Sequence, residues 1–360
     1  MVVIAGCGGY VPLYRIERET IAAQHGGSGR GESAVPARDE NHVTMACEAA
    51  GTALARAGIE GGDLGAVFAA SVTDPLAEHG IAAHVAYRFD ATGDVRTGDF
   101  RATPRAAADA LFAARAFVEA TGERAIVVAS DVLPAESGDG GEAYAGAGAG
   151  AVVVAPDAGR GNVAGESANV DATDADATDA DATDAGDAPA ATLTGWGQET
   201  TGFVERHREH GEPAIGGDAR FERRYGARPA AEAAVERALA SAEIDAPARA
   251  VACAPDARLA RTVLGGVEAE HVSTFDAVGS AGTASLLLDL AHLLETSEPG
   301  TPALAVCYGA GGADAVAFEV GEAGKRGETV ADLLDAKEYV TYAKHLEYRE
   351  PVEYQGVNRA

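Results

Sequence analysis

The stretch TGDFRATPRAAADAL, residues 97–111, has the pattern of a strand that turns directly into a helix. Elbows of this kind often carry a catalytic nucleophile, because the start of a helix stabilises a thiolate. The turn holds Thr103, Pro104 and Arg105, so no cysteine or serine stands where a nucleophile would act. Proline fits the first turn of a helix and threonine is a favourable N-cap. We therefore expect an elbow that starts a helix without supplying a nucleophile.

The other candidate nucleophiles or metal ligands are four cysteines: Cys7, Cys47, Cys253 and Cys307. They stand far apart with no CxxC pair, which argues against a zinc site and against a disulfide framework. We expect each to be a small buried hydrophobe. His207 and His210 could share a metal, but no third ligand stands at a matching spacing, so a solvated surface is the better interpretation.

Motifs for cofactors are equally weak. The glycine-rich stretches GCGG (6–9) and GAGAG (146–150) lack the GxGxxG-then-helix pattern of dinucleotide sites, and neither GxSxG nor HExxH occurs. The sequence therefore predicts no metal site and no resident cofactor.

Charge is the strongest signal of the composition. The 360 residues contain 56 acids and 28 bases, giving a net charge of −28, and only three of the bases are lysine. Such a surface repels nucleic acid and is typical of proteins adapted to molar salt, where screening removes the self-repulsion. No uncharged apolar run of 18 residues occurs, and the N-terminus enters a strand without a basic region. We therefore expect a cytoplasmic protein that does not bind membranes.

Strand-like and helix-like segments alternate along the chain. Strands are expected at 2–7, 64–71, 123–131, 145–155 and 248–255, with two more within 303–320; helices are expected at 42–57, 104–121, 227–244 and 281–295. Three landmarks recur at a similar offset: GAVFAAS resembles RAVACAP, the elbow at 103 resembles VGSAG near 280, and AIVVASD resembles ALAVCYG. These matches indicate two pseudo-symmetric halves.

The helix at 281–295 has no charged residue in its first eight positions. A helix that lacks a strongly polar face is usually covered on all sides, so it should lie between two sheets. The sequence therefore predicts stacked layers with two central helices, at 104–121 and 281–295.

Two segments fall outside the repeat. An acidic insertion at 161–195 contains the unit DATDA three times over (171–185) and is expected to be solvated and disordered, because it has no residue able to build a core. The tail at 325–360 holds all three lysines and four of the ten tyrosines. It is expected either to dock onto the body of the protein or onto a partner, or to be an ordinary amphipathic C-terminal helix.

The order of motifs resembles archaeal hydroxymethylglutaryl-CoA synthases and, more broadly, the thiolase superfamily. The supporting stretches are GCGGYVPLYRI, VTMACEAAGTALARAGIEGGDLGAVFAAS, the GDF elbow, EAYAGAGAGAVVV, FVERHREHGEPAIGG, VGSAGTASLLL, YGAGGADAVAF and YVTYAKH. The resemblance implies an α/β protein with a thiolase-like five-layered αβαβα fold, one half at 1–160 and the other at 196–324. It also implies a homodimer that binds acyl-CoA, with a thiolase and a zinc-ribbon/OB-fold protein as partners.

In this family an elbow cysteine takes the acyl group, a histidine and an asparagine polarise the thioester, and a glutamate serves in acid–base steps. Matching the motifs places these roles at Pro104, Cys253, Ser280 and Val72, so all four expected groups are replaced. Cys253 is expected to be either a buried inert thiol or a relocated nucleophile, and Ser280 could still donate a hydrogen bond.

The resemblance also implies that the turn YGAGGADAV, residues 308–316, lines the floor of the pocket. On that basis the substrate-binding candidates are Thr103, Tyr308, Gly309, Gly311 and Gly312. Three hypotheses follow: a non-catalytic subunit of a thiolase/synthase complex, an active acyl-CoA acyltransferase that uses Cys253, and a regulator that binds acyl-CoA without turnover.

Overall fold

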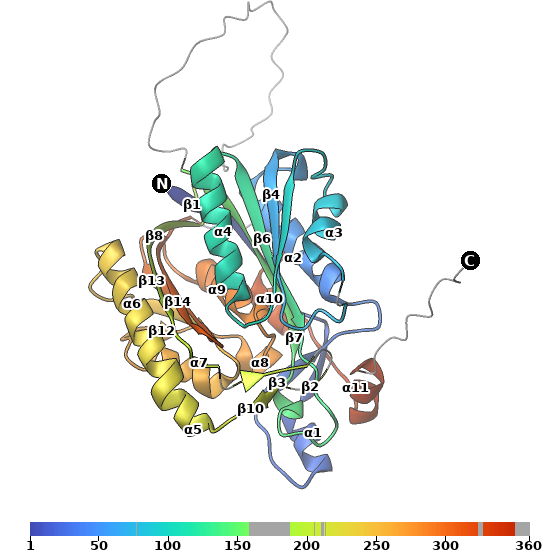
Figure 1. Cartoon of the computed structure of the whole chain (residues 1–360). Helices are drawn as coiled ribbons and strands as arrows, with labels where there is room; N and C mark the ends of the chain where they lie inside the picture. Colours follow the sequence, from blue (N-terminus) through green and yellow to red (C-terminus); the bar gives the residue numbers. More distant parts are fainter. Residues whose placement is uncertain are drawn as a thin grey trace, which may run out of the picture.

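The computed structural model describes residues 1–76, 78–157, 188–204, 206–209, 212, 214–322 and 327–349. Ten strands form one continuous sheet (Figure 1). The strands of the first half are β1 (Val2–Tyr10), β4 (Leu64–Ala70), β5 (Arg96–Phe100), β6 (Arg124–Val132) and β7 (Ala147–Pro156). Those of the second half are β8 (Ala191–Thr200), β11 (Arg249–Cys253), β12 (Glu270–His271), β13 (Pro302–Gly309) and β14 (Gly312–Val320).

The two halves repeat one topology. The first runs β5-β4-β6-β7-β1 and the second β12-β11-β13-β14-β8, and β1 joins β8 in antiparallel pairing. In each half the second strand of the order pairs in parallel with both neighbours, β4 with β5 and β6, and β11 with β12 and β13. The predicted duplication is therefore confirmed.

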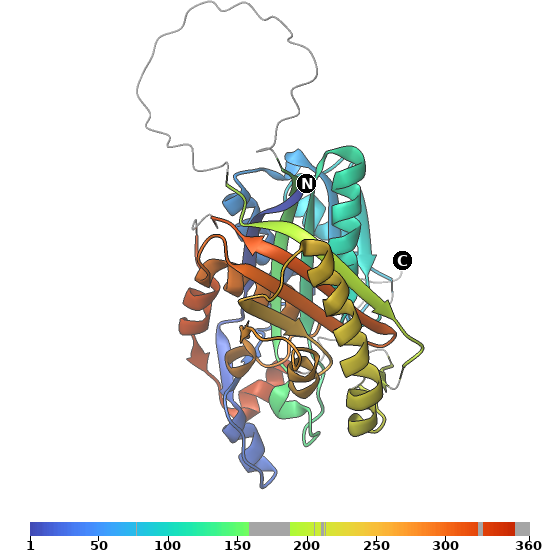
Figure 2. The ribbon, with the colours of Figure 1, turned by 90° about the vertical axis from the view of Figure 1, so that its left-hand side faces the viewer.

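Helices complete five layers. On the outer face of the first half lie α2 (His42–Ala57) and α3 (Ile81–Arg88), and on that of the second lie α6 (Arg228–Ala242) and α7 (Ala257–Val263). Between the halves lie α4 (Ala106–Thr121) and α9 (Ala284–Thr296) (Figure 1). Figure 2 shows α6 lying across the strands of the second half. This arrangement confirms the predicted αβαβα fold.

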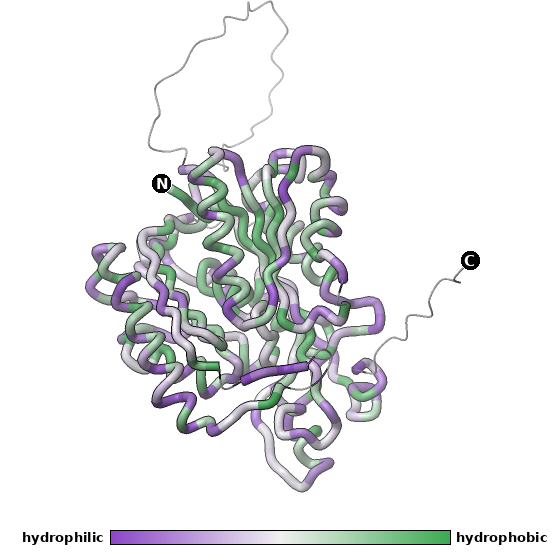
Figure 3. The backbone as a smooth tube through the Cα atoms, in the orientation of Figure 1, coloured by the Kyte–Doolittle hydropathy of each residue, from purple (hydrophilic) through white to green (hydrophobic). Residues whose placement is uncertain are grey.

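Local sequence explains these elements. Asn41 caps α2 by accepting hydrogen bonds from Val43 and Thr44, and Gly58 ends it with φ 66°, a left-handed conformation that glycine adopts without strain. In α9 nine residues are buried, Asp289 among them, as expected for a helix covered on all sides. The strands β6 and β7 are buried along nearly their whole length, and Figure 3 shows the strands of the first half as a hydrophobic centre.

Glycine pairs let the long outer helices approach the sheet. A Cβ atom at Gly6 or Gly8 of β1 would collide with the backbone of α2, and one at Gly195 or Gly197 of β8 would collide with the backbone of α6. Each half thus places two glycines, one residue apart, in its first strand beneath its long outer helix. This close packing repeats with the topology.

The smaller elements surround this body. They are β2 (Tyr14–Glu17), α1 (Arg18–Gln24), β3 (Glu32–Val35), a 3-10 turn (Gly61–Asp63), a second 3-10 turn (Glu142–Tyr144), β9 (Arg206–His207), β10 (Ile215–Gly216), α5 (Ala219–Phe221), a π-helical turn (Glu222–Ala227) and α8 (Phe275–Val278). The described part of the tail adds α10 (Val330–Asp335), β15 (Glu338–Tyr339) and α11 (Tyr342–Arg349).

The described tail residues, 327–349, pack on the body of the same chain. The strand β15 pairs with β2, Lys337 forms an ion pair with Glu32 at 3.0 Å, and Arg349 donates to the carbonyl of Ala145 at 2.6 Å. The structure therefore shows the described part of the tail docked onto the body of its own chain, which is one of the predicted alternatives.

The end of the predicted insertion differs from the structure, and two predicted segments lie outside the described residues. Strand β8 begins at Ala191, inside the range 161–195 expected for the insertion, because its alanine- and glycine-rich start pairs with β14 and β1. The DATDA repeats lie among residues 158–187, and the end of the tail among 350–360, both outside the described residues. Within the described part of the chain, no helix is long and apolar enough to span a membrane.

Candidate functional site

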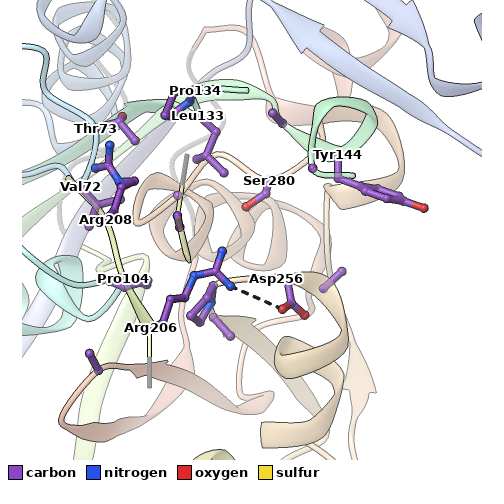
Figure 4. Close-up of a pocket in the computed structure, with 18 of the residues that line it drawn as sticks. Val72, Thr73, Pro104, Leu133, Pro134, Tyr144, Arg206, Arg208, Asp256 and Ser280 are labelled. Atoms are coloured by element: carbon purple, nitrogen blue, oxygen red, sulfur yellow. Dashed lines mark ion pairs between the residues drawn. The ribbon is translucent and has the colours of Figure 1, made fainter. Parts of the chain in front are cut away.

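A cavity of about 1060 Å³ opens where the two halves meet (Figure 4). Part of its wall comes from segments that follow the parallel strands: Ser71–Asp74 after β4, Arg101, Ala102 and Pro104 after β5, and Ala254–Arg258 after β11. The carboxyl ends of parallel strands are where open α/β sheets bind ligands. The elbow singled out from the sequence therefore lies at a cavity.

The elbow is strained at its apex. Ala102 has φ 85°, one of three non-glycine residues with positive φ among those described. Thr103 forms a turn before the helix and is not its N-cap: its Oγ1 accepts from the N–H of Arg105 at 3.0 Å, and its carbonyl accepts from the N–H of Ala106 at 2.9 Å. Helix α4 begins at Ala106, two residues later than the sequence predicted, with Arg105 at the N-cap position. Ala102 and Pro104 both line the cavity, whereas Thr103 does not. Neither lining residue has a nucleophilic atom.

The second half closes the N-terminus of α4. Thr283 donates through Oγ1 to the carbonyl of Pro104 and accepts from the N–H of Ala107, both over 2.9 Å. The same carbonyl lies 3.1 Å from the Sγ of Cys307 and 3.6 Å from the Sγ of Cys253. The N–H of Ala107 at the start of α4 is therefore already bonded within the protein and is not free to stabilise an anion in the cavity.

Cys253 is a buried hydrogen-bond donor. Its side chain is 1% exposed, and its Sγ also lies 3.3 Å from the carbonyl of Gly282. It pairs in register with Cys307, whose pKa is raised by the hydrogen bond with Cys253 and by burial. Cys253 lines a separate side cavity of about 260 Å³ and not the large one. These contacts favour the buried-thiol interpretation over the relocated nucleophile.

The loop at Val72 is held by a residue that the sequence analysis missed. Asp131, at the end of β6, accepts through one oxygen from Val72 N (2.9 Å), Thr73 N (2.9 Å), Thr73 Oγ1 (2.6 Å) and Ser71 Oγ (2.7 Å). Its other oxygen accepts from the N–H of Thr283 at 2.7 Å. The only sequence signal was an aspartate at the end of an apolar strand.

Val72 itself lines the cavity with an apolar side chain. The nearest acid along the chain, Asp74, lies 2.7 Å from the guanidinium of Arg101 in an ion pair, and its side chain is nearly buried. Asp74 is therefore held in a structural ion pair, and it does not supply the free carboxylate that the resemblance places at position 72.

The candidates from the second half lie apart from one another. Ser280 lines both cavities. Its backbone N–H donates to the carbonyl of Tyr144 at 2.7 Å, and its carbonyl accepts from the N–H of Gly146 at 2.9 Å. In the glycine turn, Ala310 lines the large cavity, although the sequence analysis did not select it. Gly309 packs against the elbow, where an added Cβ would lie 3.0 Å from Cδ of Pro104.

The remaining turn residues do not form the cavity wall. Tyr308 points to the opposite face of β13, where it is 2% exposed in the core beneath α6, because side chains alternate along a strand. Gly311 (φ 91°) and Gly312 (φ 144°) make the reversal between β13 and β14. Of the predicted substrate-binding residues, Thr103, Tyr308, Gly309, Gly311 and Gly312, none is among the residues that line the cavity.

Arginines give the cavity a positive wall in an acidic protein. The five that line it are Arg101, Arg206, Arg208, Arg258 and Arg261. Arg101 pairs with Asp74, and Arg206 lies 3.8 Å from Asp256, the ion pair drawn in Figure 4. Within the described part of the chain, the guanidinium groups of the other three have no hydrogen bond or ion pair.

No cluster of three or more metal-ligating side chains occurs among the described residues. Of the pair considered from the sequence, His207 lines the cavity and is exposed, and His210 lies outside the described residues.

The comparison of sequences decides the family. No family model matches the chain. A hydroxymethylglutaryl-CoA synthase of Methanopyrus kandleri is 30% identical over 98% of this chain and 98% of its own length. The chain belongs to the hydroxymethylglutaryl-CoA synthase family. A synthase of Caldivirga maquilingensis is 29% identical over 96% of this chain and 97% of its own. The resemblance noted from the motifs is thereby confirmed.

Solved structures agree on the fold of this hydroxymethylglutaryl-CoA synthase family member. MvaS in complex with 3-hydroxy-3-methylglutaryl coenzyme A matches with a TM-score of 0.73, 19% identity, and coverage of 97% of this chain and 91% of its own. A 3-oxoacyl-(acyl carrier protein) synthase III from Pseudomonas aeruginosa matches with a TM-score of 0.68, 21% identity, and coverage of 89% and 98%. Both likenesses concern the fold.

Proposed function

We propose that this member of the acyl-CoA condensing family binds an acyl-CoA thioester in the large cavity without carrying out the condensation. The observation that carries the proposal is a cavity of about 1060 Å³ with five lining arginines and no nucleophile at its elbow. Coenzyme A is a long, flexible polyanion, and guanidinium groups are well suited to bind its phosphates.

The missing chemistry supports the non-catalytic part. Covalent acyl transfer needs a nucleophile that is activated and accessible. At the elbow, Ala102 and Pro104 present only carbon atoms to the cavity, and Val72 presents an apolar side chain where acid–base chemistry is expected. Cys253 donates to carbonyl groups and faces another cavity. The alternative function, an acyltransferase that uses Cys253, needs that thiol to leave these partners.

Two positions on α7 support the binding part. Arg258 and Arg261 lie three residues apart, so they share one face of the helix, and both line the cavity. The ion pair found beside them, between Arg206 and Asp256, involves neither guanidinium group. One of the neighbours in fold is an HMG-CoA synthase complexed with CoA. We propose that this pair binds phosphates of the coenzyme in the present chain.

Assembly is the second part of the proposal. Strand β5 is an outer strand of the ten-stranded sheet, with one edge unpaired among the described residues, so a second copy can extend the sheet there. We propose a homodimer through this edge. A role as the non-catalytic subunit of a thiolase/synthase complex, with a zinc-ribbon/OB-fold partner, stays a prediction. The described tail residues do not argue for it, because they pack on their own chain.

One experiment separates binding from catalysis. The purified protein is titrated with acetyl-CoA by calorimetry in a series of KCl concentrations and then examined by intact mass. We expect saturable binding that weakens with salt and no acetyl-sized adduct. An acetyl adduct that disappears in Cys253→Ala would establish the acyltransferase alternative, and absence of binding at every salt concentration would refute the proposal.

A further inference from the structure

The C-terminal helix α11 contacts a loop that forms one wall of the large cavity. This wall loop, residues 133–146, joins β6 to β7. Leu133 and Ala145, near its two ends, line the cavity, and so does Tyr144. Figure 4 shows Leu133 and Tyr144 on this wall. None of the described residues of α11, 342–349, lines the cavity, so α11 can affect a ligand there only through the wall loop.

One guanidinium group joins the two ends of the wall loop. Arg349 donates through Nη1 to the carbonyl of Leu133 at 3.3 Å and through Nη2 to the carbonyl of Ala145 at 2.6 Å. Burial lowers the pKa of Arg349 to about 10, so the group stays charged at neutral pH. Hydrogen bonds from a charged donor are stronger than those between neutral groups. Arg349 therefore fixes the ends of the wall loop relative to each other.

A buried carboxylate joins α11 to the middle of the wall loop. Glu142 accepts through Oε2 from the N–H of Gly138 at 2.7 Å and through Oε1 from the hydroxyl of Tyr342 at 2.9 Å. The same hydroxyl lies 2.7 Å from Oγ of Ser137. His25 of α1 also faces this carboxylate, with its Nε2 at 3.3 Å from Oε2. The first residue of α11 thus contacts two residues of the wall loop.

His345 shows that α11 is seated in the body and is not a loosely attached surface helix. Its side chain is fully buried, its ring stacks on that of Tyr342 with centroids 6.0 Å apart, and its Nε2 lies 3.8 Å from Oε1 of Glu142. Burial lowers the pKa of His345 to about 3, so the docked ring is neutral at neutral pH. The contact between α11 and the wall loop is therefore dry at its centre.

The rest of the body holds mainly one end of the wall loop. Hydrogen bonds within the loop close short turns. From outside it, Ser33 donates through Oγ to the carbonyl of Ala143 at 2.8 Å, and the N–H of Ser280 donates to the carbonyl of Tyr144 at 2.7 Å. Both contacts lie toward β7. The end toward β6 therefore depends on Arg349 and on the contacts of α11 with Glu142.

We infer that residues 342–349 are a strap that sets the position of the wall loop, and that docking of the strap and occupation of the cavity stabilise each other. A loop that is already held costs a ligand less ordering entropy on binding. By linkage, a ligand that needs the loop in this position stabilises the docked strap to the same extent. Arg349 and Tyr342 are positioning residues in this device. The choice of acetyl-CoA as the ligand rests on the proposed function.

Hydrogen exchange of the unliganded protein tests the hold of the strap, at one pH and one KCl concentration. Peptides that cover residues 133–146 should exchange about tenfold faster in Arg349→Met than in the wild type, because two charge-assisted hydrogen bonds are lost. Tyr342→Phe should speed this exchange less, and Arg349→Lys should restore part of the protection. Glu347→Gln is the matched control on the same helix, because Glu347 bonds to Arg38 and Lys344; we expect it to change nothing.

Acetyl-CoA tests the coupling. Saturating acetyl-CoA should slow the exchange of residues 342–349 in the wild type about fivefold, although none of them lines the cavity. Calorimetry should show acetyl-CoA binding about tenfold weaker in Arg349→Met and unchanged in Glu347→Gln. A helix that only stabilised the fold would exchange at the same rate with and without the ligand.

The outcomes separate the strap from the proposed function. Unchanged exchange of the wall loop in both Arg349→Met and Tyr342→Phe overturns the strap. Exchange of residues 342–349 that ignores bound acetyl-CoA overturns the coupling. If the wild type binds neither acetyl-CoA nor CoA, the proposed function fails, whereas faster exchange of the wall loop in Arg349→Met still supports the strap. Melting temperatures establish that each variant is folded, and Tyr342→Phe carries the test if Arg349→Met does not fold.

Discussion

The N–H of Thr283 donates a hydrogen bond to Oδ2 of Asp131 over 2.7 Å, and this contact joins the two halves of the protein beneath the cavity. The opposite oxygen of Asp131 holds the loop of Val72 and Thr73. Thr283 in turn caps the start of α4 through Ala107. A single buried carboxylate therefore positions the loop, the elbow and the helix start.

We expect Asp131→Asn to lower the free energy of unfolding by about 2–4 kcal/mol, because an amide has one acceptor oxygen and places an N–H₂ group among donors. Urea or thermal unfolding at constant KCl measures the change. The control is Asp94→Asn, an exposed aspartate, for which we expect a change within about 0.5 kcal/mol. A loss in Asp131→Asn no larger than that of the control would refute this role.

The strain at Ala102 gives a second prediction. An alanine at φ 85° costs roughly 1–2 kcal/mol relative to glycine, and the greater freedom of glycine in the unfolded chain takes back about 0.5–1 kcal/mol. We expect Ala102→Gly to raise the free energy of unfolding by about 0.5 kcal/mol. Ala116→Gly, at an exposed position within helix α4, should lower it by about 1 kcal/mol. Equal destabilisation by both changes would contradict the strain.

The order of the elements could be predicted because it depends on local signals. Apolar runs, the cap at Asn41 and the left-handed Gly58 mark strands and helix ends directly in the sequence. The repeated topology is also detectable in the sequence, because the segments at β4 and β11 resemble each other. These features need no knowledge of which segments meet in space.

The wall of the cavity could not be predicted to the same degree, because it depends on contacts between distant segments. Tyr308 and Ala310 differ by two positions, yet only Ala310 reaches the cavity, because Tyr308 lies in β13 and Ala310 lies in the turn after that strand. Asp131 gains its role from loops and helices of both halves. Arg208 belongs to the stretch FVERHREHGEPAIGG that supported the family resemblance, but nothing in that stretch indicates that Arg208 lies beside Val72, as Figure 4 shows.

The cysteines provide a third prediction. Cys7, Cys253 and Cys307 are buried, and burial raises the pKa of Cys7 to about 11. Burial also raises the pKa of Cys47, but Cys47 is half-buried and is therefore accessible to a reagent. We expect iodoacetamide at pH 8 to add one group to the native protein, at Cys47, and four groups to the unfolded chain, because thiolate and access are both needed. Peptide mapping locates the adduct. Rapid modification of Cys253 in the native protein would contradict this prediction and would support Cys253 as a relocated nucleophile.

The buried carboxyl of Asp289 makes stability depend on pH. It accepts from the N–H and the Oγ1 of Thr274 at 2.8 and 2.7 Å, and burial raises its pKa to about 7. The unfolded carboxyl titrates near 3.8, so between pH 4 and 7 the native state holds a proton that the unfolded state has released. This group therefore lowers the stability of the protein as pH rises through that window.

Asp289→Asn removes the titration and keeps an oxygen for Thr274. We expect the variant to equal or fall slightly below the wild type at pH 4 and to exceed it progressively toward pH 8, by about 1–3 kcal/mol, because the wild type alone must bury a charge there. Urea unfolding of both proteins at several pH values and constant KCl measures this difference. Asp335→Asn, at an exposed position, should run parallel to the wild type. The difference in free energy of unfolding between Asp289→Asn and the wild type could instead stay constant or narrow as pH rises. That result would show that the carboxyl is ionised in the native state throughout.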